Sequence, residues 1–405
     1  MLIRDPVWGD IALPAWSAAL LDTPEMQRLR RVRQLGLAYL VYPGAQHSRF
    51  EHSLGAAHAA GMMLEAVGRS RDEWADAVIA AALLHDIAHA PFGHTFEDER
   101  PILPRHDTVE RMARALRGTV GEELAKLGCG DRAQAILTGV QDVPAWARDI
   151  VAGSVDADLL DYLRRDAYFT GVRQSYDERV LQSLALLDGR LGVQLARHGR
   201  IRLDARSEVL QLFRMRYILT ERVYLHHTKI AAGAMLAKSV ELAALQGLKP
   251  ATLYVLSDDA LLARLSGGGF GEDAMHLAQG VAQRRLLKRA FVAGRREIGE
   301  GRLAALYAQL SPADARRAAE SEIARAAGLA ARDVAISCPP APEFREMRVP
   351  TSLPEGIYPL DAPPGGDAET ALLRDRYRDL WQIGVFAPGA AAQVAGAAAR
   401  EYFAL

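Results

Sequence analysis

Apolar residues recur along most of this chain at intervals of three and four positions, which is the spacing of one face of an α-helix. Met26, Leu29 and Val32 follow this spacing. They come after Thr23-Pro24, where a capping hydroxyl and a proline predict a helix start. Further helices are predicted over residues 54–67, 74–90, 155–168 and 206–243. The pattern therefore predicts a mainly α-helical protein.

Short alternating runs interrupt the helical spacing and predict small β-hairpins. Residues 2–12 contain Asp5-Pro6 and Gly9-Asp10, which supply turn chemistry. A second hairpin is predicted where residues 193–195 and 201–203 alternate on either side of His198-Gly199.

The pattern changes after about residue 245. Predicted elements in this part are a strand at 252–256, a helix at 258–265, a glycine loop at 267–269 and a final helix at 390–402. Eight prolines within residues 339–364 predict an extended segment. We therefore expect a core over residues 1–244 and a smaller C-terminal α+β region over residues 245–405.

Composition narrows the class of protein without identifying it. The chain has 405 residues and is 50% hydrophobic and 24% charged, which is the ordinary composition of a globular protein. Its net charge of −1 argues neither for nor against a polyanionic partner. Two cysteines exclude a disulfide framework, so we expect a reducing, cytoplasmic location. No secretion signal and no membrane-spanning segment is predicted, and we expect no membrane partner.

Histidines are concentrated in one part of the chain. Histidine binds metals and transfers protons near neutral pH, so such crowding predicts a site. His58 is the member that we expect to be an ordinary residue on a helix surface. The seven histidines within residues 47–106 are His47, His52, His58, His85, His89, His94 and His106.

His85-Asp86 follows the apolar run that ends in Leu83-Leu84. A buried, unpaired aspartate is costly, so this residue predicts either a bound metal or a salt bridge. His85 and His89 also have the spacing of the zinc-protease helix motif, with Asp86 in the place of its glutamate.

Five segments, taken together and in order, resemble the HD-domain phosphohydrolase superfamily. Within it, the chain most resembles the deoxynucleoside triphosphate triphosphohydrolases, the dGTPase-like branch that includes the sterile-alpha-motif and HD-domain restriction factor. The motifs are DTPEMQRLR from residue 22, QLG from 34, YPGAQHSRFEHSLG from 42, HDIAHAPFGH from 85 and DADLLDYLRRD from 156. This resemblance favours a phosphohydrolase over a zinc protease and implies an HD-domain helical bundle.

The resemblance implies hydrolysis of deoxynucleoside triphosphates to deoxynucleoside and triphosphate at one divalent metal. The metal ligands that it implies are His52, His85, Asp86 and Asp158. Nitrogen and oxygen ligands suit Mn, Fe, Zn or Ni, and Mg less well. The catalytic residues that it implies are His89, His106, Glu97, Arg49 and His94. Within this set, Glu97 would orient His106 and Arg49 would contact phosphate.

The resemblance also implies a deoxyribonucleotide pocket. The residues matching its substrate contacts are Gln34, Tyr162, Asp166, Arg216 and Tyr224. Residues 158, 162, 165 and 166 would share one helix face. The spacing alone, without the family resemblance, would predict only a helix surface with Asp–Arg salt bridges. Two positions depart from the pattern: Leu159 replaces a phosphate-contacting lysine, and Leu225 replaces a glutamine near the base.

Relatives in this branch are oligomers activated by guanine nucleotides, which implies a homo-oligomer, a dimer or a tetramer. The residues that match activator contacts are Asp22, Gln27, Arg30 and Arg202. Two other functions stay open. One is an HD phosphohydrolase acting on a monophosphate or a signalling nucleotide. The other is a non-catalytic protein that binds nucleotides or nucleic acid, although only the arginine-rich run over residues 28–33 points to nucleic acid.

Overall fold

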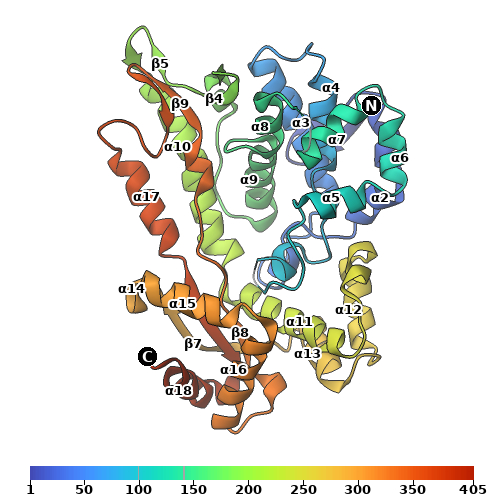
Figure 1. Cartoon of the computed structure of the whole chain (residues 1–405), viewed down its shortest axis with the longest axis vertical. Helices are drawn as coiled ribbons and strands as arrows, with labels where there is room; N and C mark the ends of the chain where they lie inside the picture. Colours follow the sequence, from blue (N-terminus) through green and yellow to red (C-terminus); the bar gives the residue numbers. More distant parts are fainter. Residues whose placement is uncertain (99, 140–141) are drawn as a thin grey trace.

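The computed structural model describes residues 1–98, 100–139 and 142–405, and it is mainly helical, as the sequence predicts. Helices of the first two hundred residues gather in the upper part of the view in Figure 1. Most of the C-terminal elements lie in the lower part, while α17 and β9 return upward beside α10.

The helices are α1 (Ser17–Leu21), α2 (Pro24–Leu29), α3 (Arg49–Ala66), α4 (Ala75–Leu84), α5 (Val109–Ala115), α6 (Thr119–Ala125), α7 (Gly130–Thr138), α8 (Ala145–Ala152), α9 (Ala157–Thr170), α10 (Leu203–Leu219), α11 (His227–Leu245), α12 (Asp258–Ser266), α13 (Glu272–Ala282), α14 (Arg295–Ile298), α15 (Glu300–Leu310), α16 (Ala313–Ala326), α17 (Ala368–Arg378) and α18 (Ala392–Phe403). The strands are β1 (Leu2–Asp5), β2 (Gly9–Ala12), β3 (Leu184–Leu187), β4 (Arg190–Gln194), β5 (Ala196–Arg197), β6 (Arg200–Ile201), β7 (Lys288–Gly294), β8 (Ala335–Ser337), β9 (Pro350–Leu353), β10 (Gly356–Pro359) and β11 (Gln382–Ala387).

The centre of the N-terminal bundle is α3, which packs against both α4 and α9. A capping box starts α3: Ser48 Oγ accepts from the Glu51 N–H, and the Ser48 N–H donates to the Glu51 carboxylate. Apart from the exposed Asp76 in its first turn, α4 is apolar and largely buried, and its alanines allow close approach of its neighbours. This packing brings the end of α4 and the start of α9 against α3.

Both predicted hairpins are present. β1 pairs with β2, and the Asp5 carboxylate accepts from the Val7 and Trp8 N–H groups in the turn. β5 pairs with β6 around His198 and Gly199, whose φ angles are 50° and 71°. Positive φ at both turn positions is the geometry of a two-residue hairpin loop.

Two predicted elements were wrong. Residues 206–243 are not one helix: α10 ends at Leu219, a π-helical turn η4 (Thr220–Tyr224) follows, and α11 begins at His227. The His226 ring caps the new helix by accepting from the Thr228 N–H. The strand predicted at 252–256 is absent: residues 252–255 belong to the 3-10 helix η5 (Pro250–Val255) and Leu256 caps it, because a proline at its first position favours a helical turn.

The proline-rich segment is extended only in part. It contains the 3-10 turn η7 (Arg345–Arg348) and the β9–β10 hairpin, and β9 pairs in parallel with β4. Phe344, Met347 and Val349 are buried in the same apolar cluster as α10 and the N-terminal bundle. The C-terminal region therefore contributes to the core beside the site, and a domain division at residue 244 stays a prediction.

A sheet of order β7-β11-β8 forms the centre of the C-terminal region, and α16 and α18 pack beside it. The buried guanidinium of Arg100 joins this region to the bundle, because it binds Glu241 of α11 and Glu320 of α16, each at 2.6 Å. Over the described ranges, no helix has the length and apolar character needed to span a membrane.

Candidate metal centre and active site

Four side chains that the sequence predicts as metal ligands come together from three helices. His52 lies on α3, His85 and Asp86 follow α4, and Asp158 lies in the first turn of α9. The Nε2 atoms of His52 and His85 are 3.2 Å apart, and Asp158 Oδ1 lies 2.9 Å and 3.7 Å from them. Asp86 adds one oxygen 3.6 Å from His85 Nε2 and another 3.7 Å from His52 Nε2. His52, His85 and Asp158 therefore form one candidate ligand group, and Asp86 lies beside it while it also groups with His89 and His106.

The end of α4 explains how adjacent residues share this cluster. α4 ends at Leu84, and residues 85–88 form turns, so His85 and Asp86 need not diverge as they would in a continuous helix. The same break rules out the zinc-protease alternative, which requires His85 and His89 on one helix face. Instead, His89 Nε2 lies 3.1 Å from Asp86 Oδ1, the same oxygen that lies 3.6 Å from His85 Nε2.

The donor set fits a divalent metal. His52 Nδ1 is 2.7 Å from Asp161 Oδ2, and His85 Nδ1 is 2.7 Å from the Ala82 carbonyl. Donation by each outer nitrogen leaves Nε2 as the lone-pair atom that faces the cluster. Burial lowers the pKa of His52, but hydrogen bonds to Asp158 and Asp161 outweigh burial and raise it to about 10. A pocket that holds a proton so firmly is electrostatically suited to a cation.

Asp161, which the sequence analysis did not single out, is held on all sides. Arg165 donates to both of its oxygens at 2.8 and 2.9 Å, and Trp8 Nε1 donates at 2.6 Å. Arg165 also donates to Asp5, so the N-terminal hairpin supports the site. A Cβ on Gly55 would lie 1.7 Å from Asp161 Oδ1, which explains a glycine inside α3. The i, i+4 spacing of Asp161 and Arg165 was the available sequence signal.

Arg49 lies beside the predicted metal ligands, and some of its hydrogen-bond donors have no partner among the described residues. Its side chain is 1% exposed, and Nη1 donates to Asp86 Oδ2 at 2.5 Å. Its Nε and Nη2 atoms have no partner among the described residues. Gly93, at φ 56°, leaves room for this guanidinium, because a Cβ there would lie 2.6 Å from Nη2. Two buried nitrogen donors, which together carry three N–H bonds, are thus available to an anion.

Three histidines predicted as catalytic form a second cluster. The rings of His89 and His106 are stacked with centroids 3.6 Å apart, and His94 lies edge-on to both at 5.1 and 5.3 Å. His106 Nδ1 is 2.8 Å from Glu97 Oε2, as the predicted orienting role requires. Burial lowers the pKa of His106, as does neighbouring His94, against the opposing hydrogen bond to Glu97.

Two arginines that the sequence analysis did not assign hold this cluster in place. Arg111 donates to Glu97 Oε1 and to the carbonyls of Ala88 and Pro104. Arg28 donates to the carbonyl of His89 at 2.8 Å. Arg28 therefore supports the backbone of the site.

The predicted substrate residues form two pairs. Tyr224 donates to Asp166 Oδ2 at 2.6 Å, and His47 Nε2 is 2.8 Å from Asp166 Oδ1. Arg216 Nη1 donates to the Tyr162 hydroxyl. Gln34 is joined to this group through its N–H, which donates to the His47 carbonyl, and its buried Oε1 has no described partner. Leu159 is 2% exposed and lies in the core.

The predicted activator residues are only partly brought together. Arg30 Nε donates to Gln27 Oε1 at 2.9 Å and its guanidinium lies 3.7 Å from the Phe50 ring centre. Asp22 is exposed at the end of α1. Arg202 lies at the start of α10 and pairs with Asp204, and no hydrogen bond or ion pair of the described residues joins it to the other three. His58 packs half-buried against Trp8, outside both clusters.

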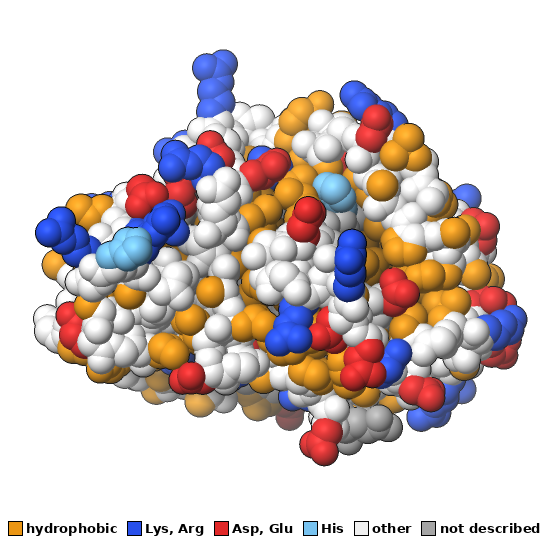
Figure 2. Space-filling view, turned by 90° about the horizontal axis from the view of Figure 1, so that it is seen from above, with side chains coloured by type: hydrophobic (Ala, Val, Ile, Leu, Met, Phe, Trp, Pro, Cys, Tyr) orange, Lys and Arg blue, Asp and Glu red, His pale blue; other side chains and the backbone are white. Residues whose placement is uncertain are grey.

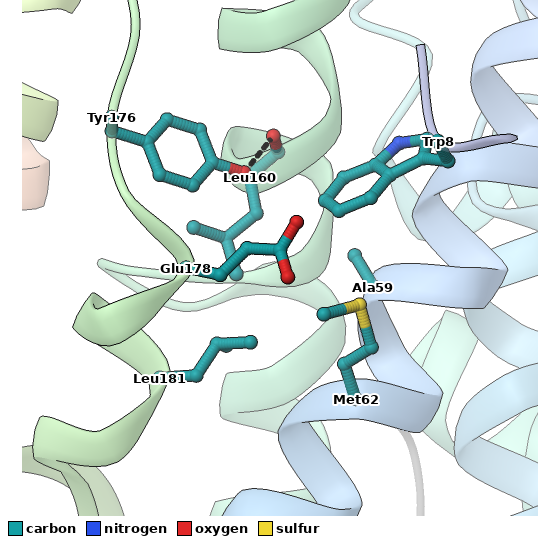
Figure 3. A pocket seen from close by; sticks show the side chains of 7 residues that line it. All are labelled: Trp8, Ala59, Met62, Leu160, Tyr176, Glu178 and Leu181. Carbon is teal, nitrogen blue, oxygen red and sulfur yellow. Dashed lines mark hydrogen bonds between the residues drawn. The ribbon is translucent and has the colours of Figure 1, made fainter. Parts of the chain in front are cut away.

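A small pocket between α3 and α9 is shown in Figure 3. Its lining residues are Trp8, Ala59, Met62, Leu160, Tyr176, Glu178 and Leu181. The Tyr176 hydroxyl donates to the Leu160 carbonyl at 2.6 Å, and Glu178 pairs with Arg164. None of the predicted metal ligands lines this pocket. We therefore interpret it as a small gap left where helices pack together.

Comparison with known families agrees with the geometry. The family model of the HD domain matches residues 49–166, which include all four clustered ligands. The model of the HD associated region matches residues 156–405, more than half of the chain. The chain therefore belongs to the HD-domain phosphohydrolases that carry an HD-associated region.

Its relatives include both uncharacterized proteins and a nucleotide hydrolase. The chain is 34% identical over 228 residues to the uncharacterized protein YwfO of Bacillus subtilis, which covers 54% of this chain and 50% of YwfO. It is 29% identical over 265 residues to the deoxynucleoside triphosphate triphosphohydrolase SAMHD1 of Danio rerio, which covers 56% and 42%. The chain spans about half the length of the curated relatives it matches.

Two solved structures share the fold over nearly the whole chain. A phosphohydrolase from Bacteroides thetaiotaomicron superposes with a TM-score of 0.72 at 26% identity, covering 96% of this chain and 100% of that one. A hypothetical protein from Aquifex aeolicus gives a TM-score of 0.70 at 22% identity, covering 98% and 99%.

Proposed function

We propose that this protein hydrolyses deoxynucleoside triphosphates to deoxynucleoside and triphosphate, using one divalent metal. The observation that carries the proposal is the position of Asp86 between two groups of side chains. Its Oδ2 contacts Arg49 and lies 3.7 Å from His52 Nε2, and its Oδ1 lies 3.1 Å from His89 Nε2 and 3.6 Å from His85 Nε2. A metal site and a phosphate-binding, proton-transferring site therefore share one residue.

The metal ligands would be His52, His85, Asp86 and Asp158, and Mn, Fe, Zn or Ni suits them better than Mg. A bound divalent metal lowers the pKa of water and polarises phosphate oxygens. The unpaired Nε and Nη2 donors of Arg49 would bind phosphate oxygens in the same pocket.

In the reaction, water oxygen bonds to the α-phosphorus, and the bond from that phosphorus to the 5′ oxygen breaks. The 5′ oxygen must gain a proton, and the water must lose one. His106, whose Nδ1 lies 2.8 Å from Glu97 Oε2, would donate that proton. Burial lowers the pKa of free His106, and the negative charge of a bound triphosphate would raise it again.

The polar group around Asp166 would bind the deoxyribose. Both Asp166 oxygens are fixed, by Tyr224 and by His47, and the buried Gln34 Oε1 is an acceptor without a partner. A 3′-hydroxyl would supply the donor that Gln34 lacks. Tyr224 would crowd a 2′-hydroxyl and favour deoxyribonucleotides.

Incubation of metal-loaded protein with each deoxynucleoside triphosphate, alone and mixed, tests this function. Ion chromatography should find deoxynucleoside and intact triphosphate in equal amounts. Pyrophosphate or free phosphate as the product would contradict the proposal. Repeating the assay with added GTP tests the guanine activator, and light scattering tests whether a homo-oligomer forms.

A second candidate is hydrolysis of a less charged phosphoester, such as a nucleoside monophosphate. Two observations favour it: Leu159 is buried where a lysine would grip phosphate, and Arg216 is paired with Glu346. Activity on monophosphates with none on triphosphates would establish this candidate.

A non-catalytic nucleic-acid-binding protein is less well supported. Figure 2 shows basic and acidic side chains interspersed on the face it displays. A nucleic-acid surface is instead expected to gather positive charge.

A further inference from the structure

Arg216, a predicted phosphate contact, is bound by a carboxylate from the C-terminal region. Its Nη2 lies 2.9 Å from Glu346 Oε1, and its Nη1 donates to the Tyr162 hydroxyl. Glu346 belongs to η7, far along the chain from α10, which carries Arg216. The contact therefore forms only when the C-terminal region packs beside the site.

The position of Glu346 is fixed by its neighbours. Met347 is fully buried, and Phe344 lies edge-on to Phe213 of α10 with ring centroids 5.8 Å apart. The Met347 carbonyl also accepts from the Asp361 N–H at 3.0 Å. The η7 turn is thus anchored on both sides of Glu346, and the carboxylate reaches Arg216 from a rigid support.

Glu346 is one of the acids whose charges act on Arg216. Burial lowers the pKa of Arg216, and the charges of Glu346 and Asp158 are among those that outweigh burial and raise it. Glu346 Oε2 is buried without a described partner, so the pairing with Arg216 satisfies only one of its two oxygens. A buried acceptor left unpaired makes such a contact easier to displace.

We propose that Glu346 is a specificity-determining residue that competes with substrate phosphate for Arg216. This inference rests on the proposed function in taking Arg216 as a phosphate contact. While Glu346 occupies the guanidinium, each added phosphate charge is repelled by the carboxylate and gains less from the arginine. Glu346 therefore disfavours polyphosphate, and more strongly than it disfavours a single phosphate.

The test uses Glu346→Gln, which keeps the shape of the side chain and removes its charge. The matched control is Glu343→Gln, which removes one charge from an exposed glutamate that pairs with Arg345. Calorimetry on the Mn-loaded protein measures binding of inorganic triphosphate and of orthophosphate, independently of turnover. We expect Glu346→Gln to bind triphosphate about fivefold more tightly than the wild type and to change orthophosphate binding less. Glu343→Gln should match the wild type.

If deoxynucleoside triphosphates are substrates, Glu346→Gln should also lower KM by a similar factor with kcat nearly unchanged. In an Arg216→Gln background, the Glu346 substitution should have no effect on triphosphate binding. The proposal is overturned if Glu346→Gln, folded by circular dichroism, binds triphosphate no more tightly than the wild type. A wild type that hydrolyses no deoxynucleoside triphosphate would reject the proposed function, while the calorimetry still decides the role of Glu346.

Discussion

The two halves of the site differ in how completely their polar atoms are paired. In the metal half, the outer nitrogens of His52 and His85 are each bound by a second partner. In the substrate half, Arg49 and Gln34 hold buried polar atoms with no described partner. An unpaired buried donor or acceptor costs about 1–3 kcal/mol. The paired half is therefore prepared for a resident ion, and the unpaired atoms mark where substrate atoms are expected.

Removing a metal ligand should have the largest effect. Asp158→Asn is expected to lose bound metal and to lower kcat/KM by about three orders of magnitude, because charge stabilisation by the ion is lost. Elemental analysis after dialysis and steady-state kinetics measure both quantities. Asp10→Asn, at an exposed partner of Arg4, is the control and should keep both. Full metal content in Asp158→Asn would remove this residue from the ligand set.

Substitution of His89, in the second histidine cluster, should lower turnover without releasing the metal. His89→Gln is expected to lower kcat by about 10²–10⁴-fold while the metal content stays at the wild-type value. His276→Asn, at an exposed histidine, is the control. If His89→Gln loses the metal as well, then His89 supports the ion and the division into two halves is wrong.

Two glycines of α3 provide a matched pair. Gly55→Ala pushes a methyl group into Asp161, so metal affinity should fall about 10–100-fold although no ligand is removed. Gly61 has nothing within 4 Å of an added Cβ, so Gly61→Ala should stabilise the fold by up to about 1 kcal/mol. Metal titration and denaturant unfolding measure the two effects. Equal behaviour of the two variants would show that Asp161 does not position His52.

A last effect concerns acid stability far from the metal. Burial raises the pKa of Glu320, but Arg100 and Lys238 outweigh burial and lower it from 4.5 to about 2. A carboxyl with a depressed pKa in the folded state stabilises the protein above its unfolded pKa, and this contribution is lost as the pH falls from about 4.5 to 2. Glu320→Gln should flatten the loss of unfolding free energy over that interval, whether or not metal is present. If the unfolding free energy of Glu320→Gln falls with pH as steeply as that of the wild type, the ionised Glu320 does not stabilise the fold through Arg100 and Lys238.

Local sequence patterns predicted the parts of the fold that depend on neighbouring residues. The N-terminal hairpin, the helix start at Thr23 and the helix at residue 258 follow from turn and capping residues. The break between α10 and α11 was missed, because apolar spacing continues through the π-helical turn. The strand predicted at 252–256 was wrong because its apolar run is short enough to suit either a strand or a helical turn.

For the site, motifs placed the candidate residues but not the side chains that hold them. Arg28 and Asp161 lie inside the quoted motifs without a predicted role, and Arg111 lies outside them; their contacts appear only when separate segments pack together. The pairing of Arg216 with Glu346 could not be predicted from the sequence. The two residues are far apart in the chain, and Glu346 lies in a proline-rich stretch with no helical or strand periodicity.

Hydrolysis in ¹⁸O-labelled water tests the central claim most directly. Metal-loaded protein should convert dGTP to deoxyguanosine and triphosphate, with one ¹⁸O atom in the triphosphate and none in the deoxyguanosine. Protein treated with a chelator should form neither product until the metal is restored. Label in the deoxyguanosine, a product of pyrophosphate, or full activity without metal would contradict attack on the α-phosphorus at a metal centre.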